Sequence, residues 1–225
     1  MKIKFGKIAA TIGLTLTALT ASAVSPASAA RNVGQNEQAL NMRIYQETRA
    51  PIGHVLFCQS NPDQCHDRNV SQPSVPQLTN ERWNELVEIN DYVNQTVSPV
   101  TDLDLYRTIE HWTYPQGGAG DCEDYVLEKQ RHLVALGWPS ESLLITVVRD
   151  ENGDGHAILT VTTSAGDFLL DNRYPIIRRW QDAPYTFRKR QSHQNPSEWV
   201  SLAPNGNIFS QLLQPSSGAD PVSSR

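Results

Sequence analysis

Residues 117–125 read GGAGDCEDY, a run of small residues that ends in a cysteine flanked by acidic residues. A helical pattern follows at once, with apolar residues at helical spacing from Val126 to Leu136. Gly137 and Pro139 are typical of the end of such a helix. We therefore expect Cys122 at or near a helix N-terminus, where unpaired N–H groups and the helix dipole favour a thiolate.

The same cysteine is also typical of a small buried apolar side chain. Its acidic neighbours Asp121 and Glu123 oppose ionisation, because negative charge disfavours a thiolate. The choice between a nucleophile and a buried thiol therefore depends on residues farther along the chain.

The rest of the chain predicts an α+β fold. An amphipathic helix is expected over Thr79–Val97, ahead of Pro99, and a shorter one over Leu103–Glu110. After the cysteine helix the apolar period changes from 3.6 to 2, which predicts strands. These strands are Leu143–Arg149, His156–Thr163 and Asp167–Leu170, joined by turn-forming residues. Strands that follow one another in this way predict an antiparallel sheet beside the helices.

Two polar residues lie at the ends of neighbouring strands. His156 opens one strand and Asp171 closes the next. His156 is about eight residues from the turn and Asp171 about five, so a bulge or a wider loop is expected to bring them together. A carboxylate beside an imidazole orients the ring, and the imidazolium can pair with a thiolate. Cys122, His156 and Asp171 are therefore candidate catalytic residues, although each alone also fits an ordinary structural role.

The motifs that carry this set also resemble a known family. Residues 120–125, 136–139, 156–159 and 170–172, in this order, resemble the bacterial transglutaminase-like cysteine proteinases. That family includes LapG-type periplasmic proteases that clip biofilm adhesins from the cell surface. The resemblance runs from Trp83 to Trp180. It implies a papain-like, transglutaminase-type fold and a cysteine endopeptidase with Cys122 as nucleophile, His156 as base and Asp171 as orienting acid.

The resemblance also implies calcium near the nucleophile and no organic cofactor. It assigns the metal to Asp121 and Glu123, with Asp124 as a helper, and carboxylate oxygens suit calcium. The alternative is that these acidic residues only stabilise a helix N-terminus. Residues 150–155 also look like the start of an EF-hand loop, but Val161 occupies the position of the closing glutamate. We therefore expect a hairpin turn there.

The N-terminal residues predict export to the periplasm. Lys2, Lys4 and Lys7 precede an uncharged apolar stretch over 8–23, and Ala27-Ser28-Ala29 fits a cleavage site. We predict a signal peptide over residues 1–29. A membrane anchor is the alternative, which the short and interrupted apolar stretch disfavours.

Cleavage would leave roughly 195 residues, enough for one domain. We expect an irregular lead-in over 30–77, a peptidase domain over 78–205 and a flexible tail over 206–225. In an oxidising compartment Cys58 and Cys65 are expected to pair. A metal site of Cys58, Cys65 and His66 is the alternative, but it lacks a fourth ligand.

The net charge of −5 argues against a nucleic-acid partner or an anionic membrane surface. A protein substrate is expected, and the resemblance adds a surface adhesin as that substrate and an inhibitory membrane receptor as a partner. Two other functions stay open. One is a transglutaminase-type amide transfer by the same acyl-enzyme, and the other is a non-catalytic binding module on the same fold.

Overall fold

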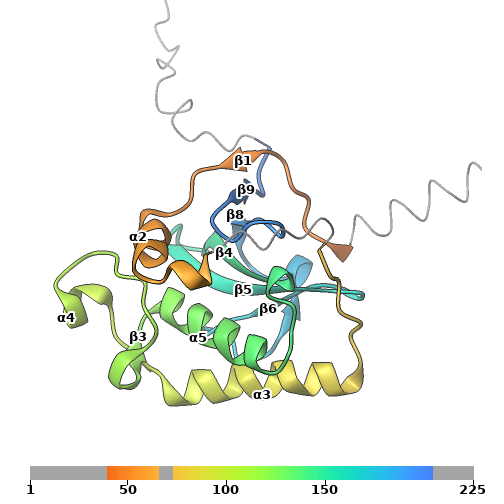
Figure 1. The fold of residues 1–225 in the computed structure, drawn as a ribbon, viewed down its shortest axis with the longest axis horizontal. Helices are drawn as coiled ribbons and strands as arrows, with labels where there is room; N and C mark the ends of the chain where they lie inside the picture. The colour runs from red at the N-terminus through yellow and green to blue at the C-terminus, as the bar shows by residue number, and fades with distance from the viewer. Residues whose placement is uncertain (1–39, 66–72, 205–225) are drawn as a thin grey trace, which may run out of the picture.

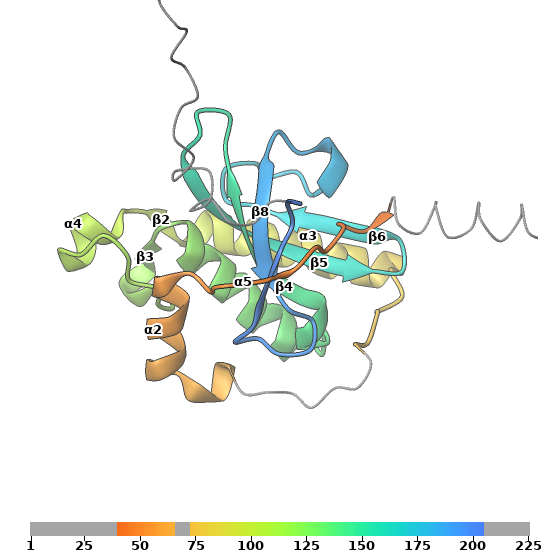
Figure 2. The same ribbon diagram turned by 90° about the horizontal axis from the view of Figure 1, so that it is seen from above.

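The computed structural model describes residues 40–65 and 73–204. In this part of the chain a mainly antiparallel sheet carries two long helices on one face (Figure 1; Figure 2). The sheet order is β1 (Glu47–Thr48), β9 (Trp199–Ser201), β8 (Thr186–Gln191), β4 (Leu143–Arg149), β5 (Gly155–Thr163), β6 (Gly166–Leu170) and β7 (Arg178–Arg179). The predicted α+β fold is confirmed.

The helices and short elements surround this sheet. The helices are α2 (Ile52–Ser60), α3 (Asn80–Thr96), α4 (Asp102–Tyr106) and α5 (Cys122–Ala135). Two short strands, β2 (Ser98–Pro99) and β3 (Ala119–Gly120), pair in parallel. Single 3-10 turns are η1 (Pro62–Gln64), η2 (Gln116–Gly118), η3 (Ser140–Ser142) and η4 (Trp180–Asp182). None of the helices in the described residues is long and apolar enough to cross a membrane.

Helix α5 begins and ends where the sequence predicts. Asp121 is its N-cap residue, and Cys122 is the first helical residue. At the other end Gly137 has a φ of 83°, a left-handed conformation that glycine adopts without steric cost. The Trp138 N–H then donates to the Leu133 carbonyl at 3.0 Å, which closes the helix and turns the chain towards β4.

The core lies between the helices and the sheet. Leu86 and Val93 of α3 pack with Val126 and Leu133 of α5. The sheet contributes Leu143, Ile145, Leu159 and Val161 to the same cluster. A smaller cluster on the opposite face contains Met42, Val148, Ile158 and Leu169, against which Trp180 and Phe187 pack. The C-terminal part of the described chain therefore covers the face that the helices leave open.

The segment after Trp180 contributes two strands that the sequence did not predict. β8 is highly charged, yet it pairs with β4 near the middle of the sheet. Its Arg190 is buried, and Nη1 of this residue pairs with Oδ2 of buried Asp167 at 3.1 Å. A buried ion pair between distant residues compensates a charge that would otherwise disfavour a central strand.

The lead-in is less irregular than expected, because it contains α2. His54 and Phe57 of this helix are buried against aromatic residues, and the His54 ring lies 5.6 Å from Trp112 and 5.2 Å from Trp199. The predicted Cys58–Cys65 disulfide is confirmed, with a Cα–Cα distance of 5.5 Å. His66, the predicted signal peptide over 1–29 and the predicted tail over 206–225 lie outside the described residues.

The two ends of the described chain meet at one edge of the sheet. Glu47 of β1 lies opposite Val200 of β9 in antiparallel register. The Ser201 N–H donates to the Gln46 carbonyl at 2.7 Å, and the Tyr45 N–H donates to the Ser201 carbonyl at 3.0 Å. The lead-in is thus a structural part of the sheet.

Candidate active site

Backbone contacts hold the approach to Cys122. Residues 119–120 pair with residues 98–99 as β3 and β2, and the Val100 N–H donates to the Gly120 carbonyl at 3.0 Å. The Tyr125 hydroxyl of α5 donates to the Val97 carbonyl at 2.5 Å. The end of α3 therefore fixes both the strand before Cys122 and the first turn of the helix after it.

The Cys122 thiol lies in a partly buried, acidic environment. It donates a hydrogen bond to Oε2 of Glu123 at 3.1 Å. Burial raises the pKa of the thiol well above its usual value, and the neighbouring Glu123 carboxylate raises it further. The Ala157 N–H, which hydrogen-bonds the sulfur, acts in the opposite direction. Burial and the acidic neighbour thus outweigh the helix N-terminus that the sequence suggested would favour a thiolate.

His156 and Asp171 are in direct contact. Nε2 of His156 lies 2.9 Å from Oδ1 of Asp171, and both side chains are buried. The pKa of Asp171 is below its usual value. Burial alone would raise it, but the hydrogen bond and charge of His156 and further hydrogen bonds outweigh that effect.

The strand register explains this contact without the predicted bulge. β5 and β6 pair in uninterrupted register from Leu159↔Leu170 to Thr163↔Gly166. Continuing that register places His156 opposite residue 173, so Asp171 occupies the diagonal position on the same face of the hairpin. Diagonal neighbours are close enough for long side chains to meet. The expectation of a bulge or wider loop was therefore wrong, although the two residues do meet.

The remaining ring nitrogen of His156 is available for chemistry. Nδ1 is buried and has no hydrogen-bond partner among the residues described here. The Cys122 sulfur accepts from the N–H of Ala157, the residue that follows His156 in β5. The three predicted catalytic residues therefore come from elements that adjoin one another, the start of α5, the start of β5 and the end of β6.

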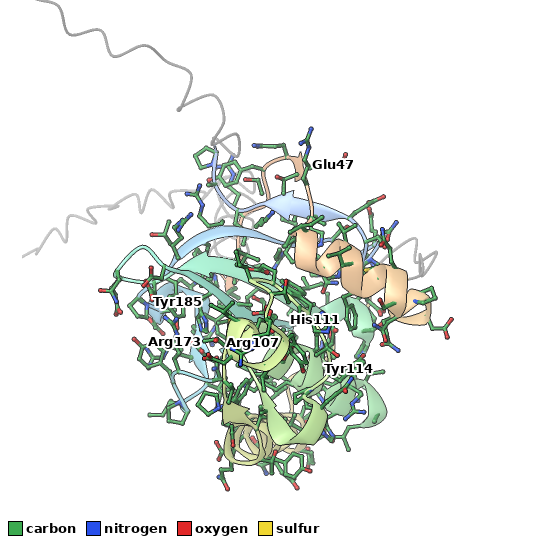
Figure 3. All side chains as sticks on the ribbon, turned by 90° about the vertical axis from the view of Figure 1, so that its left-hand side faces the viewer. Glu47, Arg107, His111, Tyr114, Arg173 and Tyr185 are labelled. Carbon is green, nitrogen blue, oxygen red and sulfur yellow. A yellow bond between two sulfur atoms is a disulfide. The ribbon has the colours of Figure 1, made fainter. Side chains whose placement is uncertain are left out.

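Tyr185 is a site residue that the sequence did not reveal. Its hydroxyl donates to Oδ2 of Asp171 at 2.5 Å, and its ring centroid lies 5.6 Å from that of His156. The Arg173 N–H donates to Oδ1 of Asp171 at 2.9 Å. Tyr185 and Arg173 lie together on one face of the molecule (Figure 3). No local signal marks Tyr185, because it lies beyond Trp180, where the resemblance to the family ends.

Three carboxylates gather beside Cys122. Oxygen atoms of Asp102, Asp121 and Asp124 lie within 4.8 Å of one another. One oxygen of each is bound by a backbone N–H: Asp102 N–H donates to Asp121 at 3.2 Å, His111 N–H to Asp102, and Thr113 N–H to Asp124 at 2.9 Å. The second oxygen of each is buried without a hydrogen-bond partner in the described part of the chain.

The electrostatics of this cluster are unfavourable without a cation. Burial raises the pKa of Asp124 to about 8, and the Asp121 and Asp102 charges contribute. Burial also raises the pKa of Asp102. Buried carboxylates with unused oxygens fit a hard divalent cation, which would satisfy the oxygens and offset the like charges.

Gly120 is necessary for the cluster. A Cβ atom at this position would lie 2.5 Å from Oδ2 of Asp124 and 2.7 Å from its Cβ. Any larger residue would therefore displace the Asp124 carboxylate.

The cluster differs in part from the ligand set that the resemblance implied. Asp121 belongs to it, and so does the predicted helper Asp124, but Glu123 is directed to the Cys122 thiol instead. Burial raises the pKa of Glu123 to about 9, with a contribution from Asp121. Asp102 was missed, because a residue at the start of a short helix after Thr101 looks like part of an ordinary capped turn.

The residues that look like the start of an EF-hand loop form the predicted hairpin turn. Oδ1 of Asp150 accepts from the N–H groups of Asn152 at 3.0 Å and Asp154 at 2.9 Å. Oδ2 of Asp150 pairs with Nη1 of Arg173 at 2.5 Å. Both oxygens of this carboxylate are therefore occupied by groups of the chain itself.

The chain is similar to several solved structures of LapG. The chain is similar to Legionella pneumophila LapG in its calcium-bound form, at 24% identity and a TM-score of 0.43, over 48% of this chain and 64% of that chain. For EGTA-treated LapG the identity is 25% and the TM-score 0.43, over 48% and 62%. For a third LapG structure the values are 24% and 0.44, over 52% and 66%. The similarity thus covers less than two thirds of each LapG chain.

A search of curated proteins found no match. The family model for the bacterial transglutaminase-like cysteine proteinases matches residues 44–207. This match includes most of the lead-in and strands β8 and β9, so it extends well beyond the residues that carried the resemblance. The chain therefore belongs to the bacterial transglutaminase-like cysteine proteinases, a family of cysteine peptidases.

Proposed function

We propose that this protein is a periplasmic cysteine endopeptidase that cleaves a protein substrate through Cys122, His156 and Asp171. The observation that carries the proposal is the buried contact between His156 and Asp171 at 2.9 Å, which leaves Nδ1 of His156 free beside the Cys122 segment. Membership of the cysteine proteinase family supports the same assignment.

In this proposal each residue has a distinct role. His156 takes the thiol proton of Cys122 at Nδ1, and the sulfur attacks the substrate carbonyl carbon to form a tetrahedral intermediate. Backbone N–H groups in the first turn of α5 stabilise the oxyanion. His156 then protonates the leaving amine, and a water molecule that it deprotonates hydrolyses the thioester. Asp171 keeps the imidazole oriented throughout.

We also propose that calcium binds beside the nucleophile, held by Asp102, Asp121 and Asp124. The unpartnered carboxylate oxygens and the space left by Gly120 support this assignment. Relatives in the structural comparison are calcium-bound and EGTA-treated forms of LapG. A bound calcium ion would supply positive charge that offsets the acidic groups around the thiol. Glu123 stays a candidate ligand of the same ion, because it forms a second group of possible ligands with Asp121 and Cys122.

The proposal also includes the substrate of the protein and its location in the cell. The sequence of residues 1–29 supports export by a signal peptide. The resemblance of residues 83–180 to LapG-type proteases suggests a cell-surface adhesin as the substrate and an inhibitory membrane receptor as a regulator. Both would be protein partners that reach the enzyme in the periplasm.

Alkylation of Cys122 tests the chemistry without a known substrate. Of the three cysteines, Cys58 and Cys65 are in the disulfide, so iodoacetamide labels Cys122 alone. In calcium, we expect labelling below the pH at which a free thiol ionises, and we expect a His156→Ala variant to lose this reactivity. Labelling that follows an ordinary thiol and does not change in His156→Ala would contradict the proposal. A Cys122→Ala variant is the control for labelling elsewhere, and it should fold normally.

A further inference from the structure

Besides Cys122, helix α5 carries a second unusual side chain, that of Lys129. Lys129 lies seven residues, or about two helical turns, after the cysteine, so both residues lie close to one face of α5. The Lys129 side chain is fully buried, with 0% exposure. Its Nζ has no hydrogen-bond partner among the described residues. A buried, unpartnered ammonium group is costly, so its presence calls for a functional reason.

The groups around Lys129 connect it to the catalytic pair. Its ammonium group interacts electrostatically with Asp171 first and with Asp91 of α3 second. On its own helix, Nζ lies 6.0 Å from the ring centroid of Tyr125. The side chains of β4 and β5 in the core beneath α5 are apolar. Asp171 is therefore the main charge that faces Lys129 from the sheet.

Helix α3 holds the same segment from the other side. Nδ2 of Asn94 donates to the Asp171 carbonyl at 2.8 Å, and Nδ2 of Asn90 donates to the Pro175 carbonyl at 2.9 Å. The amide oxygens of both residues are buried without a partner in the described chain. Asp171 thus lies between a polar surface of α3, the buried ammonium of α5 and the imidazole of His156.

We propose that Lys129 is a positioning residue of the active site, whose buried positive charge stabilises the Asp171 carboxylate from behind and so keeps His156 oriented towards Cys122. This inference rests on the proposed catalytic function. It explains why the helix that presents Cys122 also carries the buried amino group of Lys129. Burial lowers the pKa of Lys129 to about 7, so the group is charged below neutral pH, the range in which Asp171 can take up a proton.

The test is a pH profile of Cys122 alkylation in wild type and in Lys129→Met. Without the ammonium, Asp171 takes up a proton at higher pH. The acid limb of the alkylation rate should therefore move upward by about 0.5–1 pH unit. The melting temperature of Lys129→Met should be equal or higher, because an apolar side chain of similar length replaces a buried charge. If Lys129→Met does not fold, Lys129→Gln tests the same loss of charge with a polar side chain.

A buried polar residue on the sheet provides the matched control. Oγ1 of Thr146 lies 2.6 Å from Oγ1 of Thr160, away from the active site. Thr146→Val should change stability without moving the acid limb. An unchanged limb in both Lys129 variants, with normal folding, would overturn the inference. Failure of the proposed function looks different, because wild-type Cys122 would then label as an ordinary thiol and His156→Ala would have no effect.

Discussion

The Tyr185 hydroxyl donates to Oδ2 of Asp171, while Nε2 of His156 lies 2.9 Å from the other oxygen of the same carboxylate. The carboxylate is therefore fixed from both sides, and it cannot rotate without losing a hydrogen bond. A positioning role for Tyr185 follows directly from this geometry.

Tyr185→Phe should lower the rate constant for Cys122 alkylation roughly tenfold at neutral pH, because a hydrogen bond to a charged group contributes about 1.5–3 kcal/mol. The acid limb of the pH profile should also move upward, since the hydroxyl stabilises the ionised carboxylate. Tyr174→Phe is the matched control. Its ring lies 6.1 Å from that of Tyr185. Its hydroxyl, however, makes a long contact of 3.5 Å with the exposed residue Glu151. Equal rates in the two variants would remove Tyr185 from the site.

Gly120→Ala should abolish stabilisation by calcium, because the added methyl group would displace the Asp124 carboxylate. The measurement is the difference in melting temperature between calcium and EGTA. We expect wild type to melt at a higher temperature in calcium than in EGTA. The variant should melt at the same temperature in calcium and in EGTA.

Gly155→Ala is the control for the added methyl group, because nothing lies within 4 Å of a Cβ at that position. It should keep the calcium response. Asp102→Asn should lose most of the response, and a full response in that variant would remove Asp102 from the ligand set.

The two buried histidines should lower the stability of the protein in mild acid. Burial lowers the pKa of both His54 and His193 to about 4. Between about pH 6.5 and pH 4 the unfolded chain therefore binds protons at these residues that the folded protein does not. Each histidine should therefore lower the free energy of unfolding by on the order of 2–3 kcal/mol as the pH drops through this window. The raised pKa values of Glu123 and Asp124 act in the opposite direction, so the contribution of a histidine is measured against its own variant.

Urea denaturation at several pH values measures this slope. His193 accepts from Arg190, since its Nε2 lies 2.9 Å from Nη2 of that residue, so protonation would break this contact. Between about pH 6.5 and pH 4, His193→Gln should therefore lose less stability than wild type, by on the order of 2–3 kcal/mol. A slope identical to that of wild type would show that His193 does not contribute.

Removing the disulfide should destabilise the protein by about 2–3 kcal/mol, because Cys58 and Cys65 close a short loop. A Cys58→Ser/Cys65→Ser variant compared with wild type by urea denaturation measures the loss. Wild type under a reducing agent serves as the control and should lose a similar amount. No change in either case would mean that contacts such as the hydrogen bond from Oγ of Ser197 to the Cys65 carbonyl suffice to hold the loop.

The sequence was informative where the signal is local. Cys122 follows a glycine-rich turn and starts a helix with a clear C-terminal stop, and β4 has the predicted bounds. His156 and Asp171 lie on one short hairpin, so strand period alone brings them close. Their agreement with the structure therefore depends on contacts within about 15 residues.

The features that the sequence missed depend on distant contacts. Asp102 joins the acidic cluster only because Asp121 accepts from its N–H across a separation of 19 residues. Arg190 is tolerated in a central strand only because Asp167 is buried beside it. Helix α2 is weakly amphipathic, and its position depends on two tryptophans that lie far away in the sequence. No local pattern reports such partners.

The pairing of β1 with β9 also constrains the order in which the chain can fold. Thr48 can pair only after Trp199 has been synthesised, so β9 completes the edge of the sheet that β1 begins. Contacts of such high sequence separation form late and slowly. The proteinase should therefore acquire its full structure only after the chain has been made as far as β9, which would delay proteolysis until then.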